Sequence, residues 1–391
     1  MATNAGIPAP GEVLGLQQQI VRLQALLEAA RQVHSTAEEN EVLEQVLSIV
    51  VRELEMAGAS FPAAGLRYGD DPATPGCAPL RWPLTDRDGQ PMVELQVAAP
   101  EGRALTLYES DFIDGLVLQA SVALENARAH QRRLEYVRVQ QDLDAARGIQ
   151  RSLLPQHLPM SAGYQLAFRA DACYEVGGDY LDALTLADGS WLFAVADVAG
   201  KGLASALMAS SFRSAFRAMA QSGAPLAELA ARMNQHHWAE GEEARRRYVT
   251  AIFARLDPVS GRLQVVNAGH NPGMMLAPGA APRLFRASGT PLGLLPGMHY
   301  AAEELDLPAG ARLLLYTDGL TEIFSNGEEF GSGRLLAALS RCSAREADAI
   351  LKALWAEIAA FAAGGAQQDD MTALVLCRDS APGHASQETF A

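Results

Sequence analysis

The stretch WLFAVADVAGKG, residues 191–202, decides the fold expected for the second half of the chain. Its first six residues are all apolar, which is typical of a strand buried on both faces. Asp197 ends this run, and a Gly-Lys-Gly segment then leads into a helix expected over 201–220. A carboxylate at this position can bind a hard cation beside a phosphate-friendly helix start, or it can act as a helix N-cap.

Further aspartates stand at the edges of other apolar runs. They are Asp179 after Gly177-Gly178, Asp318 before Gly319, and Asp369 beside Asp370. If these carboxylates converge with Asp197, their mutual repulsion favours bound cations, and oxygen ligands suit Mg or Mn. The pattern therefore suggests a two-metal site that activates water against a phosphate ester. Simple turns at the two Gly-containing sites, with a helix starting at Thr321-Glu322, are the alternative.

The elements expected around these acids favour an α+β layered fold, because runs of strands are separated from helix pairs. Strands are expected over 191–196, 248–256, 262–267, 312–316 and 372–376, and helices over 201–220 and 344–363. Asp188-Gly189 is interpreted as a hairpin turn.

The first part of the chain has a different organisation. Apolar spacing predicts helices within 11–57, and Thr36 with Glu39 suggests a capping box at the start of the second one. Residues 58–91 are rich in Pro and Gly and are expected to be loop-rich, with a hairpin turn at Asp88-Gly89 before a strand over 92–97.

A long helix is expected from residue 109 to about 150, because this stretch holds almost no helix breaker. Its apolar stripe is too thin to bury the helix, so a dimeric coiled coil is expected, with an exposed spacer as the alternative. The helix should end at Leu154-Pro155.

Composition narrows the function further. A chain of 391 residues with 49% apolar residues is expected to form two domains and a linker. The net charge of −15 argues against nucleic-acid binding, and no apolar run reaches membrane-spanning length. The N-terminus does not resemble a secretory signal. Four scattered cysteines, Cys77, Cys173, Cys342 and Cys377, indicate a reduced, cytoplasmic protein.

Three polar motifs keep open interpretations. His270, in Asn267-Ala-Gly-His-Asn-Pro272, can either hold its loop or contact substrate. Arg245-Arg246-Arg247 is either a solvated loop or a docking site for an acidic partner. His236-His237 has no carboxylate at ligand spacing, so no metal is assigned to it.

Seven ordered motifs together resemble the SpoIIE-type branch of the metal-dependent (PPM) protein phosphatases, which are relatives of protein phosphatase 2C. The motifs are Gln150-x-x-Leu-Leu-Pro155, Val176-Gly-Gly-Asp-Tyr-x-Asp182, Ala196-Asp-Val-x-Gly-Lys-Gly202, Asn267-Ala-Gly-His-x-Pro272, Pro291-Leu-Gly293, Tyr316-Thr-Asp-Gly319 and Asp369-Asp-Met-Thr372. The resemblance covers roughly residues 145–378. One departure is Ala199, where serine is commoner.

This resemblance implies a sandwich of two antiparallel sheets flanked by helices, with two Mn or Mg ions where the sheets meet. It implies as catalytic metal ligands Asp179, Asp197, Asp318, Asp369 and the Val198 carbonyl. Secondary candidates are Asp182, Asp370, Gly178, Lys201 and His270. The implied activity is hydrolysis of phosphoserine or phosphothreonine on a partner protein, usually an anti-sigma-factor antagonist in a bacterial partner-switching pathway.

The front part more faintly resembles a short GAF sensor domain, through the helices at 26–31 and 122–128. The expected domains are an N-terminal helix (1–31), a GAF-like sensor or dimerisation domain (32–114), a coiled-coil linker (115–154), the phosphatase domain (155–379) and a disordered tail (380–391). Helix pairing would form a homodimer and regulate the enzyme. The alternatives are a non-catalytic dimeric adaptor with a structural cation, or a ligand sensor.

Overall fold

The computed structural model describes residues 10–73, 79–100, 103–365 and 367–380, and the chain divides into two compact units, 1–140 and 141–391. Cys77, the first nine residues of the expected N-terminal helix and nearly all of the expected tail (381–391) lie outside the described residues. Within the described ranges, no helix has the length and apolar character needed to cross a membrane.

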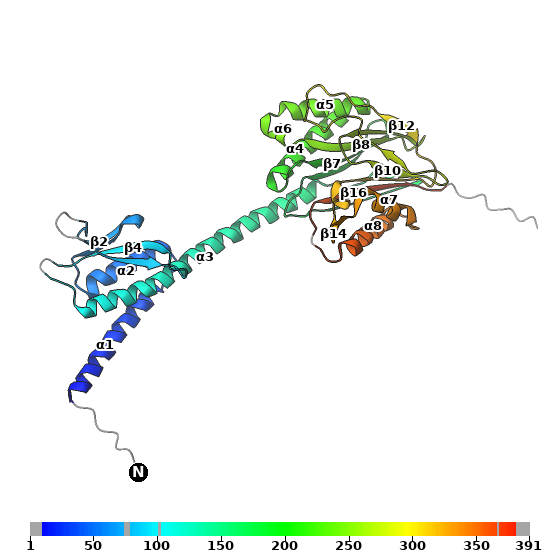
Figure 1. Cartoon of the computed structure of the whole chain (residues 1–391). Helices are drawn as coiled ribbons and strands as arrows, with labels where there is room; N and C mark the ends of the chain where they lie inside the picture. Colours follow the sequence, from blue (N-terminus) through cyan, green and yellow to red (C-terminus); the bar gives the residue numbers. More distant parts are fainter. Residues whose placement is uncertain (1–9, 74–78, 101–102, 366, 381–391) are drawn as a thin grey trace, which may run out of the picture. The chain divides into compact units, whose positions relative to one another are not determined.

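The N-terminal unit packs helices against one antiparallel sheet of order β2-β1-β4-β3 (Figure 1). Its elements are α1 (Pro10–Val33), α2 (Glu39–Glu53), β1 (Gly58–Phe61), the 3-10 turn η1 (Pro62–Ala64), β2 (Leu66–Gly69), β3 (Leu80–Thr85), β4 (Pro91–Ala98) and the first part of α3 (Leu107–Leu153). One core joins α2, α3 and the sheet, and includes the fully buried Val46, Phe61 and Leu116.

Two parts of this unit differ from the sequence predictions. The loop-rich residues 58–91 also contain the strands β1, β2 and β3, which were not predicted, because Ala59, Phe61 and Leu84 are buried despite the surrounding Pro and Gly. The capping box is wrong: Thr36 accepts a hydrogen bond from the Glu38 amide and donates to Glu41, and no side chain caps the start of α2. The strand over 92–97 and the hairpin turn at Asp88-Gly89 are confirmed.

The C-terminal unit is a sandwich of two five-stranded antiparallel sheets, of orders β11-β10-β13-β16-β5 and β12-β9-β8-β7-β6. The strands are β5 (Tyr164–Asp171), β6 (Asp179–Thr185), β7 (Trp191–Val198), β8 (Val249–Leu256), β9 (Arg262–Ala268), β10 (Gly273–Leu276), β11 (Arg283–Phe285), β12 (Glu303–Asp306), β13 (Arg312–Tyr316) and β16 (Met371–Arg378), with a small hairpin of β14 (Phe324–Ser325) and β15 (Glu328–Glu329).

Apolar side chains fill the space between the two sheets and cover both outer faces. Phe193 on β7 and Leu374 on β16 are fully buried between the sheets. Complete burial of a side chain of this size contributes about 1.5–3 kcal/mol. The alternation on β7 sends Ala194 and Ala196 to the other face, against the flanking helices. This double burial explains the continuous apolar run that the sequence shows.

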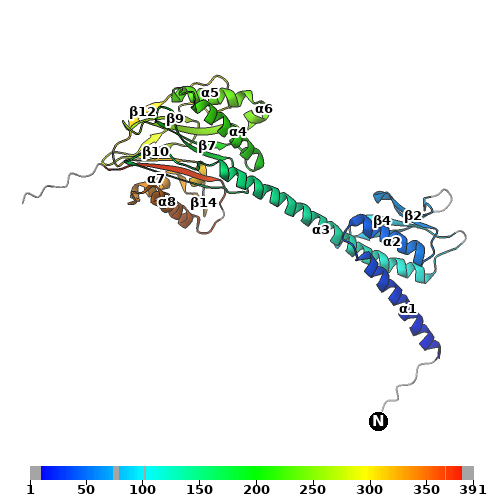
Figure 2. The same cartoon turned by 180° about the vertical axis from the view of Figure 1, so that it is seen from behind.

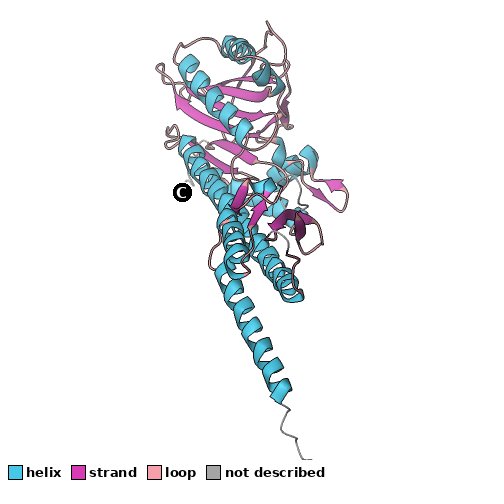
Figure 3. Cartoon of the chain, turned by 90° about the vertical axis from the view of Figure 1, so that its left-hand side faces the viewer, coloured by secondary structure: helices cyan, strands magenta, loops and turns pink. Residues whose placement is uncertain are grey.

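Two groups of helices cover the sandwich. Figure 2 shows α4 (Leu203–Ala220) and α5 (Leu226–Ala239) over the β7–β8 sheet, followed by the short α6 (Glu242–Arg246). Figure 3 distinguishes the helices from the strands by colour. On the opposite side, α7 (Gly331–Arg341) and α8 (Ala347–Ala362) lie over the sheet that contains β16. The expected α+β sandwich of two antiparallel sheets is therefore observed.

The segment after β13 forms a turn without the helix that the alternative interpretation placed after it. That interpretation had a helix start at Thr321-Glu322, but the chain forms only the 3-10 turn η2 (Asp318–Leu320). The amides of Thr321 and Glu322 both donate to the Asp318 carbonyl, and the chain then enters the β14–β15 hairpin. The next helix, α7, begins at residue 331.

Candidate metal centre

Asp179 and Asp197 face each other directly across two neighbouring strands. Asp179 begins β6, Asp197 lies one residue before the end of β7, and the two are Cα partners in the antiparallel register. Side chains in such a pair start from Cβ atoms about 4.5–5.5 Å apart. Burial and then the charge of Asp197 raise the pKa of Asp179 well above its ordinary value. Two partly buried carboxylates thus share one sheet end.

The second sheet brings further acids to the same place. Asp318 follows β13 and Asp369 precedes β16. These two strands are antiparallel neighbours, so both acids lie at the same end of the sheet. Burial, then Asp318 and then Asp369 raise the pKa of Asp197 to about 7. Burial and the charge of Asp369 also raise the pKa of Asp318. The electrostatic coupling therefore joins acids from both sheets.

Thr317 links the two sheets at this point. Its hydroxyl donates a hydrogen bond of 2.7 Å to Oδ2 of Asp179 and accepts one of 3.0 Å from the amide of Thr372. Thr317 is fully buried, so its hydroxyl fixes the orientation of the Asp179 carboxylate. No role for Thr317 was predicted from the sequence, although it lies inside the Tyr316-Thr-Asp-Gly319 motif.

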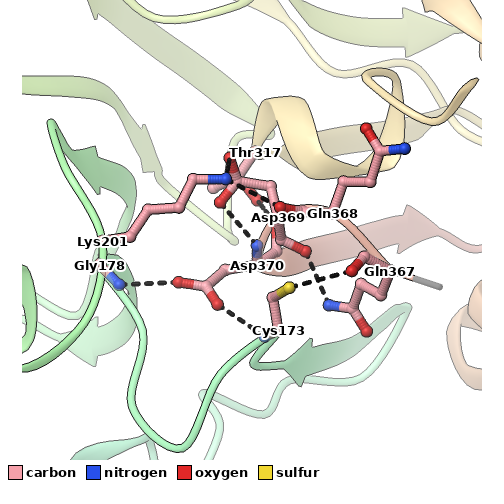
Figure 4. Close-up of polar contacts among 8 residues, drawn as sticks. All are labelled: Cys173, Gly178, Lys201, Thr317, Gln367, Gln368, Asp369 and Asp370. Atoms are coloured by element: carbon pink, nitrogen blue, oxygen red, sulfur yellow. Dashed lines mark hydrogen bonds and ion pairs between the residues drawn. The ribbon is translucent and has the colours of Figure 1, made fainter. Parts of the chain in front are cut away.

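Asp370 holds the loop before β6 rather than facing its neighbour Asp369. Its Oδ2 accepts from the amide of Gly178 at 2.7 Å, and its Oδ1 accepts from the amide of Cys173 at 2.8 Å (Figure 4). A Cβ on Gly177 would lie 2.2 Å from Asp370 Oδ2, so a glycine is required there. This carboxylate therefore positions the loop that precedes Asp179.

Gly178 makes a close approach to the end of β7 possible. A Cβ on Gly178 would lie 2.9 Å from the carbonyl oxygen of Val198 and 3.4 Å from Oδ1 of Asp197. The amide of Val198 in turn donates to the Gly178 carbonyl at 3.3 Å. The Val198 carbonyl oxygen thus lies next to a backbone that has no side chain to cover it.

Lys201 reaches across from the loop after β7 to the segment before β16. Its Nζ lies 2.9 Å from Oδ2 of Asp369 and donates to the carbonyl of Gln368 at 2.8 Å (Figure 4). Both charged side chains keep substantial contact with solvent, so this ion pair is worth at most about 1 kcal/mol. The ammonium group neutralises one carboxylate of the cluster.

Gln150, at the end of α3, makes a paired contact with the same loop that the sequence analysis left without a role. Its Nε2 donates to the Gly177 carbonyl at 2.6 Å, and its Oε1 accepts from the Gly177 amide at 3.1 Å. Nearby, Arg213 on α4 donates to the carbonyl of Leu153 at 3.0 Å. The last turn of α3 is therefore anchored beside Asp179.

His270 lies inside the protein and holds its loop. Its Nε2 donates to the carbonyl of Tyr316 at 2.9 Å, so Nδ1 accepts from the Thr250 hydroxyl at 2.8 Å. Burial lowers the pKa of His270 to about 4, so the ring is neutral. The Asn267 side chain also binds this loop through the amide and carbonyl of His270.

Asp182 lies three residues along β6 from Asp179, with its carboxylate fully buried. Its oxygens accept from Arg217 Nε at 2.6 Å and Nη2 at 2.9 Å, from the Tyr180 hydroxyl at 2.6 Å and from the Ala183 amide at 2.9 Å. Both carboxylate oxygens thus accept hydrogen bonds within the protein, and the bonds from Arg217 hold α4 against β6.

The donor set suits a divalent cation. In the described part of the chain, no three His, Cys, Asp or Glu side chains are already gathered into a metal-ligand group. Even so, the raised pKa values of Asp179, Asp197 and Asp318 show carboxylates that repel each other in a partly buried space. Binding a cation would relieve this repulsion. Glu322, an additional acid whose pKa burial and Asp318 raise, lies close to the same cluster.

The C-terminal unit is similar in sequence to known proteins. Residues 187–379 match the family model described as Stage II sporulation protein E (SpoIIE). The phosphoserine phosphatase RsbP of Bacillus subtilis is 27% identical over 183 residues, covering 46% of this chain and 45% of its own length. Protein IcfG of Synechocystis sp. is 25% identical over 264 residues, covering 61% of this chain and 42% of its own.

A solved structure supports the fold. The SiaA-PP2C domain of Pseudomonas aeruginosa covers 63% of this chain and 99% of its own, with a TM-score of 0.56 and 24% identity. The C-terminal unit is therefore a phosphatase domain of the SpoIIE-type PP2C family, in which dependence on divalent cations is typical. The chain spans about half the length of the curated relatives it matches, 42% of IcfG, 45% of RsbP and 54% of the phosphoserine phosphatase RsbU of B. subtilis.

Proposed function

We propose that this protein is a metal-dependent phosphatase that hydrolyses phosphoserine or phosphothreonine on a partner protein. The observation that carries the proposal is the direct pairing of Asp179 with Asp197, with Asp318 and Asp369 close enough from the second sheet to raise the pKa of Asp197. Hydrolysis of a phosphate ester needs positive charge beside the phosphoryl oxygens, and a carboxylate cluster can supply it only by binding cations.

The proposed ligands of two Mn or Mg ions are the side chains of Asp179, Asp197, Asp318 and Asp369 and the carbonyl of Val198. Bound ions would lower the pKa of a water molecule and neutralise charge on the phosphoryl group. The protein's own contribution is positional. Thr317 orients Asp179, and Gly178 leaves the Val198 carbonyl uncovered. Asp370 holds the loop that precedes Asp179.

The proposed substrate is a small phosphorylated anti-sigma-factor antagonist in a bacterial partner-switching pathway, acted on in the cytoplasm. The support is similarity: two relatives, RsbP and RsbU, bear the name phosphoserine phosphatase. The described cysteines Cys173, Cys342 and Cys377 are free thiols, which is compatible with a reducing compartment.

Dimerisation and regulation through the N-terminal part complete the proposal, with residues 32–114 as a short GAF-like domain and 115–154 as a coiled-coil linker. Apolar side chains on α3 are exposed in the single chain, including Leu134 at 54%, Val137 at 44% and Ile149 at 65%. A second α3 would cover such a face. Since Gln150 binds the Gly177 backbone, a change in helix pairing would reach the loop before Asp179.

The catalytic proposal is tested with Asp318→Asn and a matched aspartate outside the cluster. Asp188, in the turn between β6 and β7, accepts hydrogen bonds from Ser190 and from Arg255 on β8, so Asp188→Asn is the control. Both proteins are incubated with an aryl phosphate and with phosphorylated candidate antagonists weighed by mass spectrometry, with Mn and with a chelator. We expect Mn-dependent hydrolysis by the control and none by Asp318→Asn. Full activity in Asp318→Asn would refute the assignment.

The regulatory part is tested separately by deleting residues 1–130. The deletion should change both the oligomeric state in analytical ultracentrifugation and the specific activity. If both stay as in the full chain, regulation does not pass through these residues.

A further inference from the structure

The three consecutive arginines 245–247 have different environments, and two of them are satisfied locally. The guanidinium of Arg245 lies 4.1 Å from the ring centre of Trp238, and its Nε donates to the Trp238 carbonyl at 3.0 Å. Arg246 forms ion pairs of 2.8 Å with Glu242 and 3.5 Å with Glu243. These contacts tie both side chains to α5 and α6.

Arg247 is held by its backbone but not by its guanidinium. Its amide donates to the Ala244 carbonyl at 3.0 Å, and its carbonyl lies 2.9 Å from Nε2 of the buried His237. Among the residues that the structure describes, its guanidinium has no carboxylate partner and makes no hydrogen bond. A fixed backbone thus presents a charged group that is free to bind an anion.

The guanidinium of Arg247 lies against the loop that follows Asp197. Its Nη1 is 2.6 Å from the position that a Cβ on Gly200 would occupy. Gly200 has a backbone φ of 103°, which residues other than glycine rarely adopt. Glycine at this position therefore both allows the loop conformation and leaves room for the guanidinium.

The strand register places Arg247 at the same sheet end as the acidic cluster. Val249 pairs with Val198, and the Ala199 amide donates to the Tyr248 carbonyl at 2.9 Å, so Arg247 lies opposite Gly200. Gly200 is three residues beyond Asp197, and the next residue, Lys201, contacts Asp369. Arg247 therefore lies against the loop that joins Asp197 to Lys201.

Two exposed apolar side chains lie at the start of α4, shortly after Gly200 in the chain. Leu203 and Leu207 lie one turn apart in the first two turns of α4 and are 49% and 62% exposed. Their spacing puts them on one face of the helix, while Ser205 and Ala206 are buried. We call Arg247, Leu203 and Leu207 the α4 rim. Protein-binding surfaces often combine arginine with apolar contacts in this way.

We propose that the α4 rim binds the protein substrate next to its phosphorylated residue, with Arg247 pairing to an aspartate or glutamate there. The inference rests on the proposed phosphatase function and deepens it by assigning a substrate class, acidic phosphoproteins. A guanidinium binds a carboxylate through two parallel hydrogen bonds. In a chain of net charge −15 with an acidic active site, such a cation offsets repulsion of the approaching substrate.

The test uses the full chain with saturating Mn and two phosphoserine peptides that differ only in Glu or Gln flanking the phosphoserine. Arg247→Gln should raise the KM for the Glu peptide roughly 10-fold or more, from the usual strength of a charged hydrogen bond. It should leave hydrolysis of p-nitrophenyl phosphate and of the Gln peptide unchanged. Arg246→Gln, whose partners lie within α6, is the matched control and should behave as wild type.

A charge reversal gives an independent readout. Arg247→Glu should prefer a peptide with Lys flanking the phosphoserine over the Glu peptide, which a merely structural role would not produce. Two results would overturn the inference: an equal loss with p-nitrophenyl phosphate and the Glu peptide, or an unchanged Glu-over-Gln preference in Arg247→Gln. If the wild-type chain hydrolyses neither p-nitrophenyl phosphate nor the two phosphoserine peptides, the proposed phosphatase function itself is refuted.

Discussion

Asp197→Asn should stabilise the metal-free protein at alkaline pH while removing activity. Burial and the neighbouring acids Asp318 and Asp369 raise the pKa of Asp197 from 3.8 to about 7. Between these two pH values the unfolded chain releases this proton and the folded chain retains it. The contribution of Asp197 to stability is therefore fully present below pH 3.8 and is lost as the pH rises through about 7.

The size of this effect follows from the two pKa values. A tenfold change in proton affinity corresponds to about 1.4 kcal/mol, so the difference between 3.8 and about 7 amounts to about 4 kcal/mol at pH 8. An asparagine has no charge to bury, so Asp197→Asn should recover up to that amount in the presence of a chelator. Since Asp179 lies directly opposite, its own raised pKa should fall in the variant.

Urea denaturation in chelator at pH 8 and pH 5 measures this directly. We expect Asp197→Asn to gain stability over wild type at pH 8 and to gain much less at pH 5. With Mn added, the order should reverse at pH 8, because only wild type keeps the complete ligand set. A variant that is equally destabilised at both pH values, with and without Mn, would refute the electrostatic reasoning.

Three further predictions concern residues around the centre. Asp182→Ala should lower the free energy of unfolding by about 3 kcal/mol, because it leaves Arg217 without its buried partner, yet calorimetric Mn affinity should stay as in wild type; weaker Mn binding would assign Asp182 to the site. Gln150→Ala should weaken Mn affinity roughly fivefold by releasing the Gly177 backbone, with activity restored at saturating Mn; unchanged affinity would speak against the coupling. In wild type, the free energy of unfolding should fall by up to about 3 kcal/mol as the pH falls from 6.5 towards 4, because only the unfolded chain binds a proton at His270 in this range. Urea melts at pH 7 and 4.5 should show that the His270→Gln variant lacks this part of the decrease.

The order of elements in the C-terminal unit was largely predictable because its central strands are strongly apolar. The runs over 191–196, 312–316 and 372–376 correspond to β7, β13 and β16. The short strands β10 to β12 and the helix α7 were not predicted. Their sequences are brief or polar, and they are set by pairing with distant strands, as in the register of β12 with β9.

The candidate site shows the same division. The matched motifs located the acids that converge at the sheet ends, because each stands where an apolar run begins or ends. The hydrogen bonds that position them were not predictable, since Thr317 meets Asp179 across 138 residues of sequence and Gln150 meets Gly177 across 27. Asp182 lies in a matched motif, but the motif did not predict that its carboxylate accepts two hydrogen bonds from Arg217.

Counting bound Mn by equilibrium dialysis tests the central claim most directly, that Asp179, Asp197, Asp318 and Asp369 hold the cations of a hydrolytic centre. We expect two ions for each wild-type chain, at least one fewer in Asp318→Asn, and phosphoserine hydrolysis that rises with occupancy. Hydrolysis by a wild-type chain that holds no Mn or Mg, or the same ion count in both proteins, would contradict it.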